Sequence, residues 1–299
     1  MKVLITGATG KIGQKLINHL IDHGLSIRIL SKRTALNLSG QIEIIPGDLF
    51  NQNDLLKAVE NINTIVHLAA VTHSNNQELY WRTNVKGTEN LIKAAKKARV
   101  SRLIFVSSRA INPNGGAYSQ SKLAAEKIVK NSGINWVILR PAEVYGIGQR
   151  EMIDRLINLV KKTYLVPIIN TDKYSLAPLY INDLVDVLGK VISDDSFVNK
   201  TYVLAGPESF SFKELVEQIC QFFKLKRLKF FCPLLLLKLF FKIINLIPGQ
   251  SLLAYDQLAR FLSSKPIDIS LAQKDLGFKP ISFQEGLALI NERKDSLRS

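Results

Sequence analysis

The sequence predicts an α/β fold in which helices cover both faces of a doubly wound parallel sheet, followed by a smaller C-terminal α/β part. Three observations predict it. Short apolar runs alternate with amphipathic stretches, which is the pattern of parallel strands buried on both faces. A glycine-rich turn directly follows the first apolar run. The alternation loosens from about Ala142, which divides the chain into residues 1–141 and residues 142–299, with interleaving of the two parts left open.

Strands and helices are expected to alternate through the first part. The strands are short and apolar, at Lys2–Ile5, Ser26–Leu30, Ile42–Ile45, Thr64–Ala69, Leu103–Ser107 and Trp136–Leu139. The helices carry apolar residues at helical spacing, at Gly13–His23, Asp54–Glu60, Glu78–Arg99 and Tyr118–Asn131. In the second part, helices are expected at Met152–Lys162, Ile181–Ser193 and Ser211–Phe223, mixed with short strands.

Composition excludes several classes of protein. A hydrophobic fraction of 46% and a charged fraction of 22% are those of an ordinary globular protein. Two cysteines, Cys220 and Cys232, cannot build a disulfide framework or a cysteine-rich metal site. The four histidines show no metal-ligand spacing, so no metal site is expected. Free thiols, and a first strand that leaves no room for a signal peptide, predict a cytoplasmic protein.

The formal net charge of +15 is concentrated in residues 1–150. A basic first half attracts polyanionic small ligands such as dinucleotide phosphates. Nucleic acid is the other interpretation of a sequence pI near 9.7, but zinc-finger spacing, an RNA-binding signature and an arginine-rich arm are all missing from the sequence. We therefore expect a small-molecule partner and no nucleic acid.

The glycine-rich turn Thr6-Gly-Ala-Thr-Gly-Lys-Ile-Gly13 has a direct physical interpretation. Gly7 allows a sharp turn after the strand, Gly10 lets the backbone approach a pyrophosphate, and Gly13 allows close packing of helix on strand. The helix that follows points free N–H groups and its positive dipole end at the phosphates. A plain tight connection would use the same glycines, but the position between an apolar strand and an amphipathic helix favours a dinucleotide site.

Tyr118 and Lys122 are four residues apart, which puts a phenol and an ammonium group on one helical face. A phenol with a pKa near ~10 is a poor acid or base at neutral pH, and a neighbouring cation lowers that pKa. Tyr118 can then exchange a proton with an alcohol oxygen that the hydroxyl of Ser108 holds. Because the same spacing occurs on solvated helical faces, its meaning depends on the glycine turn that precedes it.

Further motifs follow in order along the chain, namely Asp48-Leu49, Leu68-Ala69-Ala70, Asn84-x-x-Gly87-Thr88 and Arg140-Pro141-x-x-Val144-Tyr145-Gly146. With the glycine turn, Ser108 and the Tyr/Lys pair, they make the chain similar to the extended short-chain dehydrogenase/reductases, the NAD(P)-dependent epimerase/dehydratase family. The tail Asp268-x-x-x-Ala272-x-x-x-Leu276-Gly277-Phe278-x-Pro280, followed by Glu285-Gly286, resembles the end of nucleotide-sugar epimerases and 3β-hydroxysteroid dehydrogenase-like proteins. The resemblance covers the whole chain and implies a Rossmann-type sheet.

The resemblance also implies roles for single residues. Asp48 and Leu49 would contact adenine, Asn84 would help to position the active-site helix, and Pro141 and Val144 would lie by the nicotinamide. The full expected cofactor set is Gly7, Thr9, Gly10, Lys11, Ile12, Gly13, Ser31, Arg33, Asp48, Leu49, Leu68, Ala69, Ala70, Asn84, Tyr118, Lys122, Pro141 and Val144. Substrate contacts are expected from Thr72, His73, Ser108, Arg109, Asn112, Tyr145 and Arg150. Ala69, Ala70 and Val144 would also suit a plain core, and Asn84 a structural or helix-capping position.

The end of the second strand bears on cofactor choice. NAD-specific folds place an acid there for the ribose 2′-hydroxyl, whereas a basic residue accommodates a 2′-phosphate. Here the sequence Leu30-Ser31-Lys32-Arg33 contains no acid and predicts NADP, with NAD as the alternative. A solvated basic loop would have the same sequence.

The residues after Ser108 bear on the reaction. Sugar-nucleotide dehydratases, which are similar in this region, carry Asp-Glu there because elimination of water needs a carboxyl acid and base. Arg109 and Ala110 stand in their place in this chain, so dehydration is not expected.

Residues 224–249 are unusual in charge and hydropathy. No Asp or Glu occurs between Glu217 and Asp256, and nearly every residue from Pro233 to Ile247 is Leu, Phe or Ile. The stretch is too short to cross a hydrocarbon core of ~30 Å. We expect residues 233–247 to form a helix that lies on an anionic membrane surface or packs against the substrate-binding part or a subunit partner. A homodimer is left open.

Together these observations predict an NADP-dependent oxidoreductase or epimerase that acts on an alcohol or ketone carbon. Ser108 would bind the oxygen and Tyr118 would exchange the proton, while Lys122 would lower the pKa of Tyr118 and hold the nicotinamide ribose. The resemblance makes a nucleotide sugar the expected substrate. One alternative is a 3β-hydroxysteroid dehydrogenase-like enzyme on a lipid alcohol at a membrane surface. Another is a non-catalytic nucleotide-binding scaffold similar to the accessory Rossmann subunit of respiratory complex I, which the presence of the Tyr/Lys pair disfavours.

Overall fold

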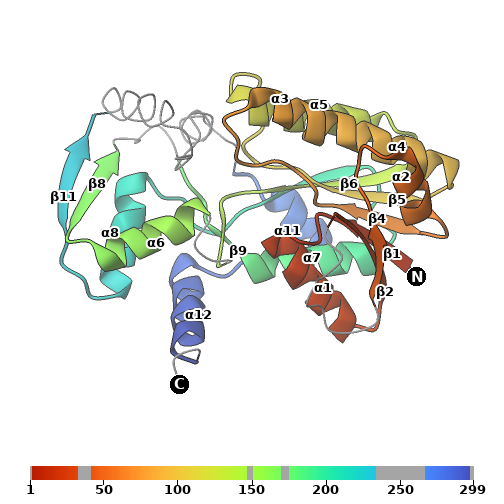
Figure 1. Ribbon diagram of the computed structural model, residues 1–299. Coiled ribbons are helices and arrows are strands. Elements are labelled where there is room, and N and C mark those ends of the chain that lie inside the picture. The colour runs from red at the N-terminus through yellow and green to blue at the C-terminus, as the bar shows by residue number, and fades with distance from the viewer. Residues whose placement is uncertain (1, 33–41, 147–150, 170–174, 234–266, 297–299) are drawn as a thin grey trace. The chain divides into compact units, whose positions relative to one another are not determined.

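Figure 1 shows the computed structural model of the chain, which describes residues 2–32, 42–146, 151–169, 175–233 and 267–296. The chain forms two compact units. Unit 1 comprises Met1–Arg140 and Val185–Tyr202, and unit 2 comprises Pro141–Leu184 and Val203–Ser299. The polypeptide enters unit 2, returns to unit 1 and leaves it again, so the two units interleave in sequence.

Unit 1 is built on a seven-stranded sheet with the strand order β10-β6-β5-β4-β1-β2-β3. Its strands are β1 (Lys2–Thr6), β2 (Ser26–Ser31), β3 (Ile42–Pro46), β4 (Thr64–His67), β5 (Arg102–Val106), β6 (Asn135–Pro141) and β10 (Lys200–Leu204). Neighbouring strands from β3 to β6 are parallel. The strand order reverses between β1 and β4, and sheets of this kind bind ligands at the carboxyl ends of the strands at that point. The predicted doubly wound, Rossmann-type sheet is confirmed.

Helices cover both faces of this sheet, as Figure 1 shows, with α2, α4 and α5 on one face and α1 and α7 on the other. Their bounds are α1 (Lys11–Asp22), α2 (Gln52–Val59), α4 (Thr88–Lys97), α5 (Gly116–Lys130) and α7 (Ile181–Ser193). The core under the first face contains Leu4, Leu55, Ile65, Leu91, Leu103 and Val129, all buried. Burial of each such side chain contributes about 1.5–3 kcal/mol to folding. On the other face α7 packs closely on α1, since a Cβ at Gly189 would lie 2.4 Å from Nε2 of His19.

The expected single helix at Glu78–Arg99 is divided in the structure. It consists of α3 (Gln77–Tyr80), the π-helical turn η1 (Trp81–Gly87) and α4, in one continuous helical run. The hydroxyl of Thr88 donates a hydrogen bond of 2.7 Å to the carbonyl O of Asn84, a side-chain bond to the preceding turn of the kind that distorts helices. Apolar spacing cannot reveal such a turn, because the helix resumes the same buried face after it.

Strand β10 is a second difference from the sequence-based expectation. It comes from the second half of the chain but pairs with β6 at the edge of the unit 1 sheet. It is short and its residues alternate between buried and less buried positions, because an edge strand has one neighbour and partial cover. The short strands expected after Ala142 therefore do not all belong to the second unit.

Unit 2 contains two small sheets and four helices among its described residues. The sheets pair β7 (Val144–Tyr145) with β9 (Leu179–Tyr180), and β8 (Leu165–Ile169) with β11 (Leu228–Cys232). The helices are α6 (Met152–Lys162), α8 (Phe212–Phe222), α11 (Ser270–Leu276) and α12 (Phe283–Ser296). Helix α8 begins with a capping box, in which Ser211 and Glu214 satisfy each other's backbone N–H groups.

The apolar segment at residues 233–247 lies outside the described residues, apart from Pro233. In the part of the chain that the structure describes, no helix is both long enough and apolar enough to cross a membrane.

Candidate active site

The glycine turn after β1 brings backbone against backbone. Gly7 has a φ of +77°, and a Cβ there would lie 2.5 Å from the backbone N of Ala69. A Cβ at Gly13 would lie 2.6 Å from the carbonyl O of Gly7. Only glycine fits either position without displacing backbone, which agrees with the sharp turn and the close helix–strand packing expected from the sequence.

Helix α1 begins at this turn with an open amino end. Gly10 is its N-cap residue, no side chain caps it, and its first turn contains no acid. Thr9, Gly10 and Lys11 are exposed, and Ile12 is half-buried. Free N–H groups and the positive end of the helix dipole are therefore available to an anion such as a pyrophosphate.

The residues expected near adenosine lie at the carboxyl ends of β2 and β3. Ser31 is the buried last residue of β2, and Nζ of Lys32 lies 2.6 Å from Oδ2 of Asp48. Leu49 is buried against Gly87, where a Cβ would lie 3.1 Å from Cδ1 of Leu49. The structure thus brings Ser31, Asp48 and Leu49 to the same edge of the sheet as the glycine turn. Arg33 lies outside the described residues.

The loop after β4 lies against the glycine turn. Leu68, Ala69 and Ala70 are half-buried, and the backbone of Ala69 is the part that Gly7 approaches. Ala69 also packs against the core of unit 1. Its side chain therefore serves the core while its backbone borders the turn, so both roles expected for it are compatible.

Asn84 ties this loop to helix α5. It is buried in the π turn η1, and its Oδ1 accepts a hydrogen bond of 2.8 Å from the backbone N of Val71. Its Nδ2 donates to the carbonyl O of Val71 at 3.1 Å and to Oγ of Ser121 at 3.0 Å. These are the contacts of a positioning residue, and π turns occur frequently at functional sites.

Helix α5 carries Tyr118 and Lys122, both buried, at 6% and 2% exposure. The ring of Tyr118 meets the ring of Tyr80 edge to face, with centroids 5.9 Å apart. Nζ of Lys122 donates a hydrogen bond of 2.7 Å to the carbonyl O of Val106 and lies 4.1 Å from the ring centroid of Phe105. Lys122 is therefore fixed at the end of β5, two residues before Ser108.

Burial sets the protonation of Lys122. Desolvation lowers its pKa from 10.5 to about 7, and the nearby charge of Glu126 acts in the opposite direction. Glu126 is itself held by Arg140 in a bidentate contact of 2.9 and 2.6 Å. The carbonyl and the aromatic ring favour the ammonium, but desolvation outweighs them, so Lys122 gains and loses its proton near neutral pH.

Two serines between Tyr118 and Lys122 also shape the site, although sequence reasoning assigned them no role. Ser119 and Ser121 have no exposed surface. Oγ of Ser119 donates to the carbonyl O of Ala110 and accepts a hydrogen bond of 2.6 Å from the backbone N of Asn112. Ser119 therefore fixes the loop that carries Ser108. Because the two serines are two residues apart, they lie on different sides of the helix, and side-chain periodicity does not single them out.

The loop after β5 contains three residues expected to bind substrate. Ser108 is half-buried, and its Oγ accepts a hydrogen bond of 3.0 Å from the backbone N of Ala110. Arg109 is buried, and Oδ1 of Asn112 accepts a hydrogen bond of 2.8 Å from the backbone N of Asn114. This loop leads directly into α5. The assignment of these residues to substrate stays a prediction.

The other residues expected to bind substrate are dispersed. Thr72 and His73 are exposed, with Oγ1 and Nδ1 2.7 Å apart. Tyr145 belongs to unit 2 and has no exposed surface, and a Cβ at Gly286 would lie 1.8 Å from its hydroxyl. Contact between Tyr145 and substrate would require this packing to open. Arg150 lies outside the described residues.

The residues expected beside the nicotinamide, Pro141 and Val144, also belong to unit 2. Pro141 is buried as the last residue of β6, and Val144 is half-buried in β7, paired with Leu179. Their contact with the cofactor stays a prediction.

His67 connects the glycine turn with the π turn, a role that the sequence did not reveal. Its Nδ1 lies 2.6 Å from Oγ1 of Thr6, and its Nε2 lies 2.9 Å from Oγ1 of Thr88. Because Thr88 donates its own proton to the carbonyl O of Asn84, we assign the imidazole proton to Nε2. Burial, and then the nearby charge of Lys122, lowers the pKa of His67 to about 3, so the imidazole is neutral.

We expect this buried imidazole to destabilise the protein in acid. The unfolded chain takes up the proton near pH 6.5, whereas the folded chain takes it up only near pH 3. Between these values the unfolded chain binds more protons, so the free energy of unfolding falls as the pH falls, by at most about 1.4 kcal/mol per pH unit. His67→Gln should remove this component, because an amide can contact both hydroxyls without titrating. Urea titrations at several pH values measure the difference, with the exposed His23→Gln as control, and parallel profiles for parent and variant would contradict it.

No group of His, Cys, Asp and Glu side chains among the described residues could hold a metal ion. The chain does fit a dinucleotide. Gly7 and Gly13 allow the close backbone packing that forms the turn, and Gly10, exposed at the N-cap of α1, leaves the backbone open to a pyrophosphate. Ser31 and Asp48 lie at the neighbouring strand ends, and Lys122 lies at the end of β5.

Known proteins are similar to most of the chain. Residues 3–205 match the NAD dependent epimerase/dehydratase family. The UDP-glucose 4-epimerase of Vibrio cholerae is 28% identical over 95% of this chain and 92% of its own. The 3 beta-hydroxysteroid dehydrogenase/Delta 5-->4-isomerase of Mycobacterium tuberculosis is 24% identical over 74% of this chain and 69% of its own.

The solved structure of MoeE5 in complex with UDP-glucose and NAD is 24% identical and superposes with a TM-score of 0.77, covering 99% of this chain and 100% of that chain. This likeness extends the agreement in fold beyond the region of the family match. From the glycine turn through the Tyr/Lys helix to β10, the chain belongs to the NAD dependent epimerase/dehydratase family.

Proposed function

We propose that the protein is an NAD(P)-dependent oxidoreductase or epimerase that acts on an alcohol or ketone carbon of a nucleotide sugar, through Ser108, Tyr118 and Lys122. The observation that carries the proposal is the hydrogen bond of 2.7 Å between Nζ of Lys122 and the carbonyl O of Val106. It holds the ammonium at the strand end that leads to Ser108, on the same helical face as Tyr118.

Each of the three side chains has one task. A bound nicotinamide supplies the site that gives or takes the hydride. The Ser108 hydroxyl donates a hydrogen bond to the reacting oxygen, and Tyr118 takes the proton from the sugar hydroxyl as it becomes a ketone. The Lys122 ammonium stabilises the Tyr118 phenolate. Epimerisation uses the same residues, provided that the keto sugar turns over before it is reduced on its other face.

A nucleotide sugar is supported as substrate by two similar proteins. The relative from Vibrio cholerae is a UDP-glucose 4-epimerase that matches nearly the whole chain, and the MoeE5 structure holds UDP-glucose. Dehydration is disfavoured in this chain, because Arg109 and Ala110 follow Ser108 and neither is a carboxylic acid.

For the cofactor we propose NADP, with NAD as the alternative. The argument for NADP is the sequence Ser31-Lys32-Arg33, which offers cations and no acid after β2. Against it, Lys32 already pairs with Asp48, and the MoeE5 structure holds NAD. The chemistry of Ser108, Tyr118 and Lys122 is the same with either cofactor.

A lipid or sterol-like alcohol is the second candidate substrate. The similarity to a 3 beta-hydroxysteroid dehydrogenase from Mycobacterium tuberculosis favours it. A cytoplasmic location, a homodimer and a membrane contact through residues 233–247 remain predictions from the sequence.

Two measurements on the purified protein test the proposal: the identity of the bound cofactor and the turnover of candidate substrates. Mass spectrometry of the denatured protein identifies the dinucleotide, and chromatography follows UDP-glucose and UDP-galactose. We expect one of two results: interconversion of the two nucleotide sugars with tightly held NAD, or their oxidation with exchange of NADP. In both cases Lys122→Met should lose turnover. Turnover of a 3β-hydroxysteroid alone would favour the second candidate. A bound dinucleotide with no turnover of any of these alcohols would contradict an enzyme and favour the scaffold.

A further inference from the structure

The outer face of the β8/β11 sheet in unit 2 is apolar and exposed. Parallel pairing sets Leu228 beside Leu165, Phe230 beside Pro167 and Cys232 beside Ile169. Val166 and Ile168 are buried, so the alternation of side chains along β8 puts the other set on the opposite face. We call Leu165, Pro167, Ile169, Leu228, Phe230 and Cys232 the β8/β11 outer face.

Exposure on this sheet is unusually high for apolar side chains. Leu165 is 50% exposed, Leu228 is 57% exposed and Phe230 is 41% exposed. Phe231, which pairs with Ile168, is 66% exposed but belongs to the opposite set of side chains and is not part of this face. An exposed apolar group of this size on one face of a sheet marks an interaction surface rather than a scatter of single residues.

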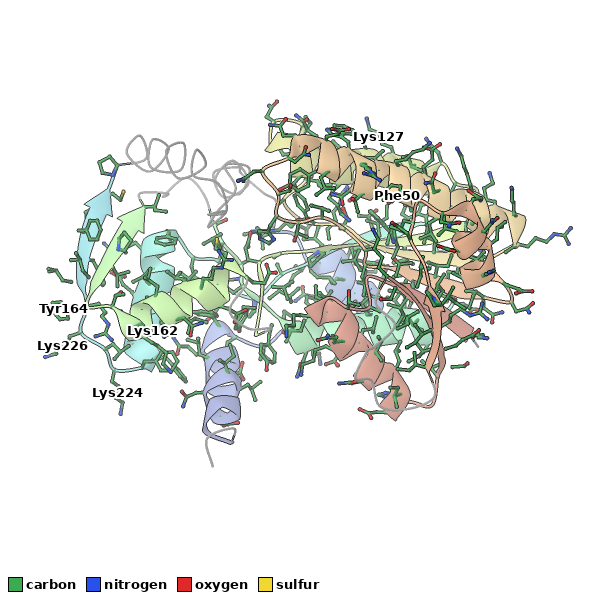
Figure 2. All side chains as sticks on the ribbon, viewed as in Figure 1. Phe50, Lys127, Lys162, Tyr164, Lys224 and Lys226 are labelled. Atoms are coloured by element: carbon green, nitrogen blue, oxygen red, sulfur yellow. The ribbon has the colours of Figure 1, made fainter. Side chains whose placement is uncertain are left out.

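Lysines surround the amino end of the same sheet. Because β8 and β11 are parallel, the segments that lead into them, from α6 and from α8, meet at this end of the sheet. The backbone N of Leu228 donates a hydrogen bond of 2.9 Å to the carbonyl O of Tyr164. Figure 2 shows Lys162, Tyr164, Lys224 and Lys226 gathered at this end of unit 2. We call Lys162, Lys224 and Lys226 the lysine rim. All three are exposed.

Hydrogen bonds from Arg227 hold the backbone of the lysine rim in place, and the rim charges are not neutralised by nearby acids in the described part of the chain. Arg227 donates from Nε to the carbonyl O of Val160 at 2.7 Å and from Nη2 to the carbonyl O of Lys161 at 3.1 Å, which fixes the start of β11 to the end of α6. Glu217 contacts Lys229 at 3.2 Å and not the rim. Among the described residues, the rim lysines form no ion pair of their own.

We propose that the β8/β11 outer face, with the lysine rim, docks the protein on an anionic lipid surface. Apolar and aromatic side chains enter the boundary between headgroups and acyl chains, and lysines beside them gain free energy from anionic headgroups. The long lysine stems let the charge reach the headgroups while the sheet stays at the surface. The surface consists of described residues alone, so it requires neither residues 234–266 nor the proposed function.

A second copy of the chain is the alternative partner for the β8/β11 outer face. A twofold contact through this surface would bring the three lysines of each rim close together, and no acid lies between Glu217 and Asp256 to offset them. The chain as a whole also carries a formal net charge of +15. Charge complementarity therefore favours an anionic partner over a copy of the same surface.

The test is co-sedimentation of the full-length protein with vesicles of phosphatidylcholine, with or without phosphatidylserine. We expect the parent to bind the vesicles that contain phosphatidylserine, to release at high salt, and to bind neutral vesicles weakly. Lys224→Gln with Lys226→Gln should weaken partitioning about 30-fold, which corresponds to about 1 kcal/mol per lysine. Phe230→Ser should weaken it at every salt concentration.

Matched controls separate docking from folding and from total charge. Lys97→Gln with Lys127→Gln removes the same charge from exposed positions of unit 1, and Leu289→Ser replaces a 39% exposed leucine on α12. Both should bind as the parent does. Equal binding of the rim variant and its control, or a parent that ignores the vesicles, would overturn the proposal. A concentration-dependent dimer in solution that Phe230→Ser abolishes would assign the face to a second copy and would also overturn it.

Discussion

Replacing Tyr118 with Phe is expected to lower turnover by a factor of about 10²–10⁴, the usual contribution of one positioned acid–base group. The phenyl ring keeps the edge-to-face contact with Tyr80, and the helix keeps its buried face. Cofactor affinity and the free energy of unfolding should therefore stay near those of the parent. Steady-state turnover of the nucleotide sugar gives the first quantity, and a dinucleotide titration gives the second.

Tyr164→Phe is the matched control for this change, because Tyr164 is 68% exposed in unit 2. It should leave turnover unchanged. If Tyr118→Phe retained near-normal turnover with an intact cofactor site, Tyr118 would not be the proton-exchanging group. If it lost cofactor binding as well, the loss of turnover would reflect damage to the site rather than missing acid–base chemistry.

Gly7→Ala is expected to have the largest effect on stability and cofactor binding. The new Cβ would lie 2.5 Å from the backbone N of Ala69 and 2.7 Å from the carbonyl C of Leu68, and backbone atoms cannot move aside as side chains do. The residue would also keep a φ of +77°, which costs a residue with a side chain about 1–2 kcal/mol. We expect the free energy of unfolding to fall by about 3 kcal/mol, and dinucleotide affinity to fall with the displaced turn.

Gly133→Ala carries the conformational cost of this change without the steric clash. Gly133 has a φ of +76°, almost the same as Gly7, but nothing lies within 4 Å of a Cβ at that position. It should therefore show only the conformational cost of about 1–2 kcal/mol and keep cofactor affinity. Chemical denaturation and dinucleotide titration of both variants measure the two components. Equal losses in the two variants would mean that the close approach of Gly7 to Ala69 contributes nothing.

Short-range patterns made much of the fold and some of the site predictable. The alternation of apolar strands with amphipathic helices depends on residues a few positions apart, and it gave the sheet and the places of most helices. The glycine turn was equally readable, because the φ of Gly7 and the close contacts of Gly13 arise within one strand–turn–helix unit. The spacing of Tyr118 and Lys122 was readable for the same reason, since one helix carries both.

Some features depend on partners far away in the sequence and were not predictable from local pattern. β10 became part of the unit 1 sheet because β6 offered an unpaired edge, not because its own residues differ from other short strands. Ser119 fixes the Ser108 loop through hydrogen bonds with the backbone of Ala110 and Asn112. A small polar residue in the sequence does not indicate which backbone groups it will contact.

The sequence by itself determined the doubly wound sheet, the glycine turn and the identity of the candidate Ser108, Tyr118 and Lys122 set, since each follows from backbone conformation and side-chain periodicity over a short span. Only the tertiary structure decided which groups are charged and which are accessible. His67 is neutral because burial between two threonines removes it from water, and Lys122 titrates near neutral pH because burial desolvates its ammonium. Desolvation depends on everything packed around a group, and that environment exists only once distant segments have come together.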